Sequence, residues 1–216
     1  MLTIALAKGR TTDGVWPLLV AAGLPLPTAL DETRALVFDV DADAATLQVD
    51  RMRYLLAKPA DVPTYVQYGV ADLGIVGKDI LMEEPRDVSE LVDLECACCR
   101  LCVAGRPEDE LRPPRRVATK YPRLTDQYFR SQGTAVEIVP LSGSIELAAV
   151  IGLTDRIFDL VQTGATLRAN GLKVFDTVSD VSARLIANRS SYHLQREAIR
   201  QVADALAAAV TRRRRG

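Results

Sequence analysis

The stretch of this chain that is best equipped for chemistry runs from Asp155 to Leu167, where an apolar strand ends in Thr-Gly-x-Thr and enters a predicted helix. Backbone N–H groups at the start of a helix, together with the hydroxyls of Thr163 and Thr166, suit a phosphate monoester. Gly164 lets the backbone approach such a ligand closely. A plain strand–turn–helix with a capping threonine is the competing interpretation.

Two carboxylates precede this loop, and one of them, Asp159, lies on the incoming strand. Asp159 lies four residues before Thr163, and Asp155 lies four residues earlier still. A carboxylate beside a phosphate repels a second phosphate, but it suits ribose hydroxyls or a Mg²⁺ ion. The arrangement resembles the phosphoribosyl-pyrophosphate (PRPP) loop of phosphoribosyltransferases.

Histidine and cysteine chemistry is less favoured. The single histidine, His193, stands at the start of a predicted helix, where a solvated or capping role is expected. Four cysteines fall within seven residues: Cys96, Cys98, Cys99 and Cys102. They could hold a metal, but zinc sites usually draw ligands from two separated segments. We therefore predict a buried strand from Leu94 to Ala104, in which cysteine packs as a small apolar residue.

Strands and helices are predicted to alternate along the chain. The expected strands cover residues 2–7, 35–39, 46–49, 53–57, 73–76, 117–119, 136–140, 157–161, 174–181 and 184–187. The expected helices cover residues 11–22, 64–68, 78–83, 122–131, 144–149, 164–170 and 196–210, after which the arginines at 212–215 trail off. Such alternation indicates α/β layers around mostly parallel sheets, arranged here as two small lobes with a cleft between them.

The composition is that of an ordinary soluble protein. The 216 residues include 27 Lys and Arg against 28 Asp and Glu, a net charge of -1 that gives no general argument for nucleic-acid binding. No stretch reaches 18 apolar residues, so no membrane span or membrane partner is expected. The N-terminus carries its positive charge after its apolar run, the reverse of a signal peptide, so we expect a cytoplasmic location.

Motifs spread over about residues 2–192 extend the resemblance, in family order, to the ATP phosphoribosyltransferase (HisG) family. They are Ala5–Arg10, Asp61–Tyr65, Ala71–Asp79, Ala118–Pro122, Pro140–Ala148, and Glu146 with Gly152, Asp159 and Thr163–Leu167. The chain is similar in length to the short form of that family, which lacks the C-terminal regulatory domain of the long form.

The resemblance implies a fold and a reaction. The fold is like that of type II periplasmic binding proteins: α/β, two lobes with mixed, mostly parallel sheets, and an active site in the interlobe cleft. Lobe I would comprise residues 1–94 plus 178–216, and lobe II, with the PRPP loop, residues 95–177. The implied glycosyl transfer joins N1 of the ATP adenine to C1 of PRPP and releases pyrophosphate, the first step of histidine biosynthesis. Mg²⁺ would be held mainly by substrate phosphates rather than by protein ligands.

The resemblance also implies roles for particular residues. Because the leaving pyrophosphate carries most of the charge, cations near it matter more than a strong base. The candidate catalytic cations are Lys8, Arg10, Arg34 and Lys58. The candidate PRPP-binding residues are Asp155, Asp159, Thr163, Gly164, Ala165 and Thr166. The candidate nucleotide-binding residues are Gly9, Asp72 and Gly74.

Some of these positions have a competing interpretation. Lys8 and Arg10 could be surface charges of a turn, Arg34 could be an ordinary exposed arginine, and Asp72 could simply cap or pair a neighbouring group. Lys58 stands where the family is expected to have arginine, and lysine lacks the bidentate geometry of a guanidinium.

The short form of the family implies a partner, a regulatory subunit that resembles class II histidyl-tRNA synthetases. We therefore expect homodimers within a hetero-oligomer. Two other functions remain open from the residues alone. A ligand-binding module would share the two-lobed fold, but Asp159 with Thr-Gly-x-Thr favours a phosphoribosyl ligand over a free amino acid. A purine-salvage phosphoribosyltransferase would leave the N-terminal motifs unexplained.

Overall fold

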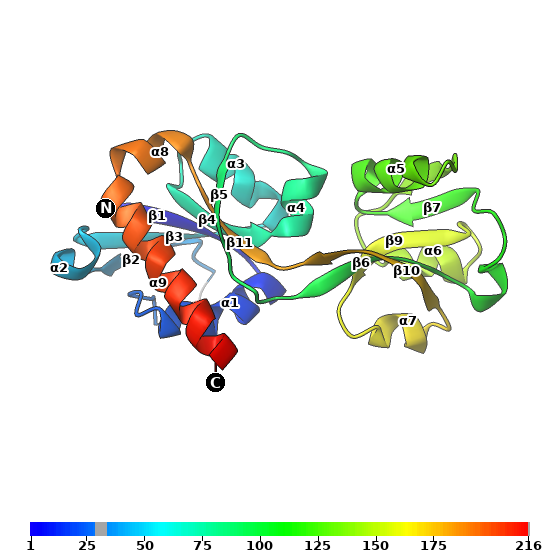
Figure 1. The fold of residues 1–216 in the computed structure, drawn as a ribbon, viewed down its shortest axis with the longest axis horizontal. Helices are drawn as coiled ribbons and strands as arrows, with labels where there is room; N and C mark the ends of the chain where they lie inside the picture. The colour runs from blue at the N-terminus through cyan, green and yellow to red at the C-terminus, as the bar shows by residue number, and fades with distance from the viewer. Residues whose placement is uncertain (29–33, 216) are drawn as a thin grey trace. The chain divides into compact units, whose positions relative to one another are not determined.

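The chain forms two compact units, which Figure 1 shows in a computed structural model that describes residues 1–28 and 34–215, apart from the side chains of Arg10 and Thr46. Unit 1 comprises Met1–Ala97 with Ser182–Gly216, and unit 2 comprises Cys98–Val181. The chain thus leaves unit 1 once and returns once. The boundaries lie three and four residues later than those predicted, because Val181 still pairs with Cys99 inside unit 2.

Unit 1 is built on a six-stranded sheet. Its strands, in spatial order, are β2 (Val37–Asp41), β3 (Arg51–Ala57), β1 (Leu2–Ala7), β4 (Leu73–Gly77), β11 (Ala183–Ala187) and β5 (Ser89–Asp93). The central strands β3, β1 and β4 run parallel, and the outer pairs run antiparallel. Every residue of β1 is buried, as expected for a strand covered on both faces.

Helices cover both faces of this sheet. They are α1 (Arg10–Ala21), α2 (Ala44–Leu47), α3 (Val62–Gln67), α4 (Lys78–Glu83), α8 (Arg189–Leu194) and α9 (Arg196–Arg215), with a 3₁₀ turn η1 (Pro59–Asp61) before α3. Alternation along β1 divides the core, because Ile4 and Leu6 pack with α1 and α9, whereas Ala5 and Ala7 pack with α3. The carboxyl ends of β1, β3 and β4 are thereby fixed at one edge of the sheet.

Unit 2 holds a five-stranded sheet with three helices. Its strands, in spatial order, are β10 (Lys173–Val181), β6 (Cys99–Gly105), β9 (Arg156–Val161), β7 (Arg116–Thr119) and β8 (Glu137–Pro140). Its helices are α5 (Pro122–Ser131), α6 (Ile145–Val150) and α7 (Ala165–Ala169), with a 3₁₀ turn η2 (Pro107–Asp109). Strands β9, β7 and β8 run parallel, so their carboxyl ends share one edge.

The sheets are mixed, as predicted, but they are not mostly parallel. Among the nine strand pairs of the described residues, β1–β3, β1–β4, β7–β8 and β7–β9 are parallel and the other five are antiparallel. The chain enters unit 2 through β6 and leaves it through β10, so these two strands necessarily run in opposite directions. The same return path makes β11 antiparallel to β4.

Three of the local predictions are wrong. Residues 46–49 were expected to be a strand, but Ala44–Leu47 is helical because the Asp43 carboxylate accepts the Ala45 N–H and caps the turn. The cysteine strand begins only at Cys99, since Glu95 and Ala97 adopt positive φ and Cys98 is exposed. Arginines 212–215 continue α9 rather than trailing off it.

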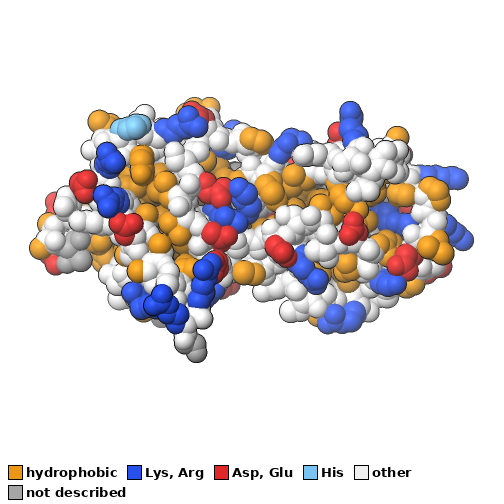
Figure 2. Space-filling model, in the orientation of Figure 1, with side chains coloured by type: hydrophobic (Ala, Val, Ile, Leu, Met, Phe, Trp, Pro, Cys, Tyr) orange, Lys and Arg blue, Asp and Glu red, His pale blue; other side chains and the backbone are white. Residues whose placement is uncertain are grey.

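The surface carries no field of a single sign on the face that Figure 2 displays, where acidic and basic side chains are interspersed. This agrees with the net charge of -1. Within residues 1–28 and 34–215, no helix is long and apolar enough to cross a membrane.

Candidate active site

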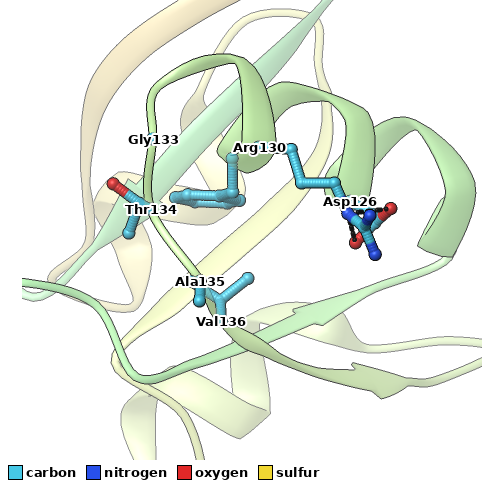
Figure 3. A pocket seen from close by; sticks show the side chains of 7 residues that line it. Asp126, Arg130, Gly133, Thr134, Ala135 and Val136 are labelled. Atoms are coloured by element: carbon cyan, nitrogen blue, oxygen red, sulfur yellow. Dashed lines mark hydrogen bonds and ion pairs between the residues drawn. The ribbon is translucent and has the colours of Figure 1, made fainter.

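A cavity of about 350 Å³ in unit 2 lies beside α5, and Figure 3 shows the side chains around it. It is lined by Asp126, Phe129, Arg130, Gly133, Thr134, Ala135 and Val136. Its only cation, Arg130, is neutralised by Asp126 one helical turn away, with Nε 2.8 Å from the carboxylate. None of the predicted site residues lines this cavity, so the candidate site has to be sought elsewhere.

The predicted phosphate loop connects β9 to α7. Gly164 has a φ of +71°, a conformation that glycine adopts without strain. The Ala165 N–H donates to Thr163 Oγ1 at 3.3 Å, and Arg168 Nη1 donates to the Thr163 carbonyl at 2.9 Å. These bonds order the loop from within, while Thr163, Ala165 and Thr166 stay at least partly exposed. The loop therefore presents two hydroxyls and backbone N–H groups to solvent at the carboxyl end of β9.

The two carboxylates of β9 have different surroundings. Asp159 is half-buried two residues before the end of the strand, with one carboxylate oxygen 2.8 Å from the Leu160 N–H. Asp155 lies before the first residue of β9, at the opposite edge of the sheet. Six residues of extended strand separate the two edges by about 20 Å. Asp159 is thus the carboxylate that lies near the phosphate loop.

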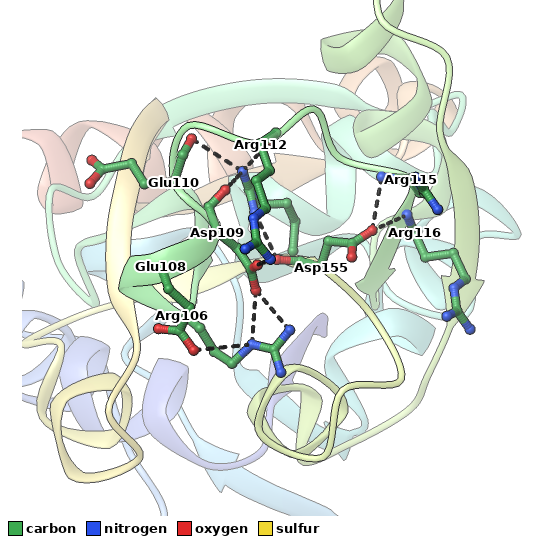
Figure 4. A network of polar contacts seen from close by, with 9 residues as sticks. Arg106, Glu108, Asp109, Glu110, Arg112, Arg115, Arg116 and Asp155 are labelled. Atoms are coloured by element: carbon green, nitrogen blue, oxygen red, sulfur yellow. Dashed lines mark hydrogen bonds and ion pairs between the residues drawn. The ribbon is translucent and has the colours of Figure 1, made fainter.

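Asp155 instead holds the backbone of the segment before β7. One of its oxygens accepts the N–H groups of Arg115 at 2.9 Å and Arg116 at 3.0 Å, as Figure 4 shows. Burial raises the pKa of this carboxyl, but the two N–H donors together with the charges of Arg116 and Arg156 outweigh burial, and the pKa lies below its usual value. The position and the partners of Asp155 therefore favour a structural role in unit 2 over the predicted ribose-binding role.

The neighbouring strands bring further residues to the same edge as the phosphate loop. Thr119 at the end of β7 lies opposite Phe158, so Lys120 comes level with Asp159 and is exposed. The buried Thr119 hydroxyl donates to the Phe158 carbonyl at 2.8 Å and accepts the Tyr121 N–H at 2.8 Å, which fixes the turn that carries Lys120. Sequence reasoning missed Lys120, although it lies within the motif Ala118–Pro122.

The carboxyl edge of the unit 1 sheet gathers three of the predicted cations. Ala7 pairs with Ala57, so Lys8 and Lys58 follow two adjacent parallel strands, and the Lys8 N–H donates to the Ala57 carbonyl at 2.9 Å. Both lysines are exposed. Arg34 is exposed and lies three residues before β2, whose Val37 pairs with Leu55 of β3. This antiparallel register brings Arg34 to the Lys58 end of β3.

The start of α1 completes this edge. Gly9 has φ +87° and ψ -147°, a region that is essentially restricted to glycine. A Cβ at this position would meet nothing within 4 Å. Glycine is therefore required by the backbone conformation and not by a lack of space. The side chain of Arg10 lies outside the described part of the chain. Lys78, which the sequence motifs did not single out as a site residue, follows β4 at this edge and pairs with Glu90 at 2.6 Å.

Two predicted nucleotide-binding residues have structural contacts. Asp72 lies at the amino end of β4, where its carboxylate accepts the Thr3 N–H at 2.8 Å, the Ser191 hydroxyl at 2.6 Å and the Gln195 side-chain amide at 2.8 Å. Gly74 lies within β4, where a Cβ would come 2.6 Å from Val66. The geometry favours structural roles over nucleotide binding, because Asp72 is at the edge away from Lys8 and Gly74 is sealed beneath α3.

Known proteins share the sequence and the fold of this chain. A family model described as HisG, ATP phosphoribosyltransferase, matches residues 58–208. The chain belongs to the ATP phosphoribosyltransferase family. An ATP phosphoribosyltransferase of Geobacillus kaustophilus is 52% identical over 213 residues, 97% of this chain and 99% of the relative. That of Bacillus subtilis is 46% identical over 97% of this chain and 96% of the relative.

Solved structures support both the family and the fold. The ATP phosphoribosyl transferase (HisG:HisZ) complex from Thermotoga maritima aligns with a TM-score of 0.78 at 30% identity, over 98% of this chain and 100% of that chain. A periplasmic sulfonate-binding protein from Methylobacillus flagellatus aligns with a TM-score of 0.62 at 14% identity, over 96% of this chain and 67% of that chain. The expected likeness of this ATP phosphoribosyltransferase family member to periplasmic binding proteins is confirmed at the level of the fold.

Proposed function

We propose that this chain transfers the phosphoribosyl group of PRPP to N1 of the ATP adenine and releases pyrophosphate, the first step of histidine biosynthesis. Relatives named for this activity match 97% of the chain at up to 52% identity. The observation that carries the assignment to particular residues is the exposed Thr163–Thr166 loop at the carboxyl end of β9, with Asp159 just ahead of it. Ligands of open α/β sheets bind at this edge.

The loop is proposed to bind PRPP through its 5′-phosphate. The N–H groups around Gly164 and the Thr163 and Thr166 hydroxyls can donate to phosphate oxygens without desolvating a cation. Asp159 lies beneath the loop on the same strand, so its carboxylate can accept from ribose hydroxyls.

The cations at the carboxyl edge of unit 1 are proposed to stabilise the leaving group. The adenine N1 lone pair forms the new bond to C1 while the C1–O bond breaks, and pyrophosphate departs with that electron pair. Lys8 and Lys58, with Arg10 and Arg34, supply positive charge where the negative charge develops. The open Gly9 backbone lets a phosphate approach closely. Because N1 already carries a lone pair, no histidine or other base is needed to begin the attack.

Mg²⁺ is the proposed metal of this metal-dependent family. No three His, Cys, Asp or Glu side chains gather into a metal-binding group within the described ranges, 1–28 and 34–215. Mg²⁺ commonly takes its ligands from substrate phosphates, water and one or two carboxylates. The ion is proposed to arrive with the phosphates of PRPP and ATP, and to neutralise part of their charge.

The partner is proposed to be a HisZ-type regulatory subunit. The similar structure from Thermotoga maritima is that of a HisG:HisZ complex, and its matched chain is covered completely by this one. We place this chain as homodimers within such a hetero-oligomer, in the cytoplasm, where ATP and PRPP are made. Relatives matched over 96–99% of their own length support the short form of the family.

The test is direct. Mixing the chain with ATP, PRPP, Mg²⁺ and the HisZ-type subunit should give phosphoribosyl-ATP, which is followed by its absorbance. Leaving out PRPP, or replacing ATP with a nucleotide that lacks adenine, should abolish the signal. Absence of product in the complete mixture would contradict the proposed function.

A further inference from the structure

Helix α6 of unit 2 is apolar on two faces. Its inner face, Ile145, Ala148 and Ala149, is buried in the core of unit 2. Its outer face follows the helical spacing i, i+3, i+4 with Leu147, Val150 and Ile151, whose exposed fractions are 55%, 42% and 65%. A surface helix normally has one apolar stripe and polar residues on the opposite face. The outer face therefore has the character of a surface that a partner covers.

The exposed apolar surface continues past the end of α6. Leu153, the third residue after the helix, is 39% exposed. We call Leu147, Val150, Ile151 and Leu153 the apolar ridge. A Cβ on Gly152 would lie 3.5 Å from Arg106 Nη1, so the segment 106–116 adjoins the ridge. Leu111 in that segment is 97% exposed. Five large apolar side chains are thus open to solvent on adjoining parts of one unit.

The segment 106–116, which we call the arginine loop, is held rigidly from beneath. The buried Arg156 guanidinium donates to the carbonyls of Glu110 at 3.2 Å and Arg112 at 2.8 Å, and it stacks on Phe175 with 4.6 Å to the ring centre. The buried Asp109 carboxylate accepts from Arg106 at 2.8 Å and Arg112 at 3.1 Å. Leu111 therefore projects from an ordered loop. Because the loop is already ordered, less conformational entropy is lost when a partner binds.

The arginine loop also carries charge without a partner. Asp155 fixes the backbone of Arg115 and Arg116, and Figure 4 shows both guanidinium groups pointing away from the network. Within the described residues neither guanidinium forms an ion pair. The two glutamates of the loop already lie near other cations. Glu110 pairs with Lys173 at 2.9 Å, and Glu108 lies 3.9 Å from Arg106.

We infer that the apolar ridge and the arginine loop together form the docking face for an acidic surface of the regulatory subunit, an inference that rests on the proposed function. Apolar centres with arginine at their edge are typical of protein interfaces. A two-fold contact with a second copy of this chain would bring the same two unpaired arginines from both copies into one interface, where their like charges repel. Charge complementarity therefore favours a different, acidic partner.

The experiment measures the dissociation constant between the purified chain and the HisZ-type subunit by sedimentation, without substrates. Ile151→Asp and Arg115→Glu should each raise it about tenfold or more, the loss expected when an anchor or a paired charge of an interface is removed. The matched controls are Val70→Asp, an exposed valine of unit 1, and Arg130→Glu, an exposed arginine of unit 2 outside the docking face. The controls should bind within twofold of wild type.

Other outcomes would overturn the inference. They are unchanged binding by both variants, equal losses in the controls, no complex with the wild-type chain, or a change in self-association of the chain alone. The midpoint of thermal unfolding of each variant should match that of wild type, because the altered side chains are exposed. If Ile151→Asp unfolds at a lower temperature than wild type, Leu147→Asp is used in its place. The dissociation constant is measured without substrates and does not depend on catalysis. Failure of docking is therefore distinguishable from failure to form phosphoribosyl-ATP.

Discussion

Single residues of the phosphate loop carry the PRPP binding that we propose. Thr-Gly-x-Thr could be located from residue types alone, because glycine and flanking hydroxyls follow an apolar strand, but the motif equally fits a plain capped turn and gained its interpretation from Asp159 ahead of it. The roles of Asp155 and Asp159 could not be separated in this way. Their spacing is compatible with either end of a strand, and only the strand bounds reveal that one lies near the loop and the other holds Arg115 and Arg116.

Thr166→Val tests the phosphate loop. The change removes one hydroxyl and keeps the shape, so the KM for PRPP should rise about tenfold, the usual value of one hydrogen bond to a charged group, while the KM for ATP stays within twofold. Steady-state kinetics with either substrate varied give both values. Thr134→Val, a threonine of the same unit away from the loop, is the control. An unchanged PRPP titration would rule out the loop as the phosphate site.

Asp155→Asn should weaken the fold of unit 2. Because the folded-state pKa of Asp155 is lowered, its contribution to stability is present above the unfolded value of about 4 and is lost as the pH falls through the folded value. The variant should lose about 1–2 kcal/mol near pH 7, and its difference from wild type should shrink below about pH 4. Urea unfolding at several pH values measures this, and a difference independent of pH would argue against the carboxylate as the cause.

At the scale of elements, the strands and helices with clear periodicity were predicted well. The helix expected over 122–131 is confirmed as α5, and the strand over 2–7 as β1. Strand β5 was missed because Ser89–Asp93 mixes charged and apolar residues, and its partner β11 lies some ninety residues away. Such pairing is a tertiary effect that no local pattern contains.

The contact between β4 and α3 depends on Gly74. In Gly74→Ala the new methyl group would lie 2.6 Å from Val66 and 3.0 Å from Val62, so the helix must shift. The free energy of unfolding should fall by about 1–3 kcal/mol. Gly143→Ala meets nothing within 4 Å and has no positive φ, so it should be nearly neutral. Equal effects in urea unfolding would show that crowding beneath α3 is not the cause.

Asp72 ties three elements of unit 1 together. In Asp72→Asn the amide would present N–H donors where the Thr3 N–H, the Ser191 hydroxyl and the Gln195 amide also donate. Stability should fall by about 1–3 kcal/mol, with the KM for ATP unchanged at a temperature where the variant is folded. A raised KM for ATP without loss of stability would restore the nucleotide-binding role.

For the molecule as a whole, the sequence pattern indicated two α/β units but not how the chain passes between them. The crossing follows from the pairing of β6 with β10 and of β11 with β4, between residues that lie 68 or more positions apart. The family resemblance, and not periodicity, implied this path. In each unit the residues that remain candidates for substrate binding lie at the carboxyl edge of the parallel strands, whereas Asp72 and Asp155 lie at the amino edges.

The most direct measurement of this division is the dissociation constant for PRPP of two variants altered near opposite ends of β9. Asp159 lies two residues before the carboxyl end of β9, and Asp155 immediately precedes its amino end. We expect Asp159→Asn to weaken PRPP binding about tenfold or more, and Asp155→Asn, measured where it is folded, to bind within twofold of wild type. Weakened binding in Asp155→Asn with unchanged binding in Asp159→Asn would contradict the proposed site.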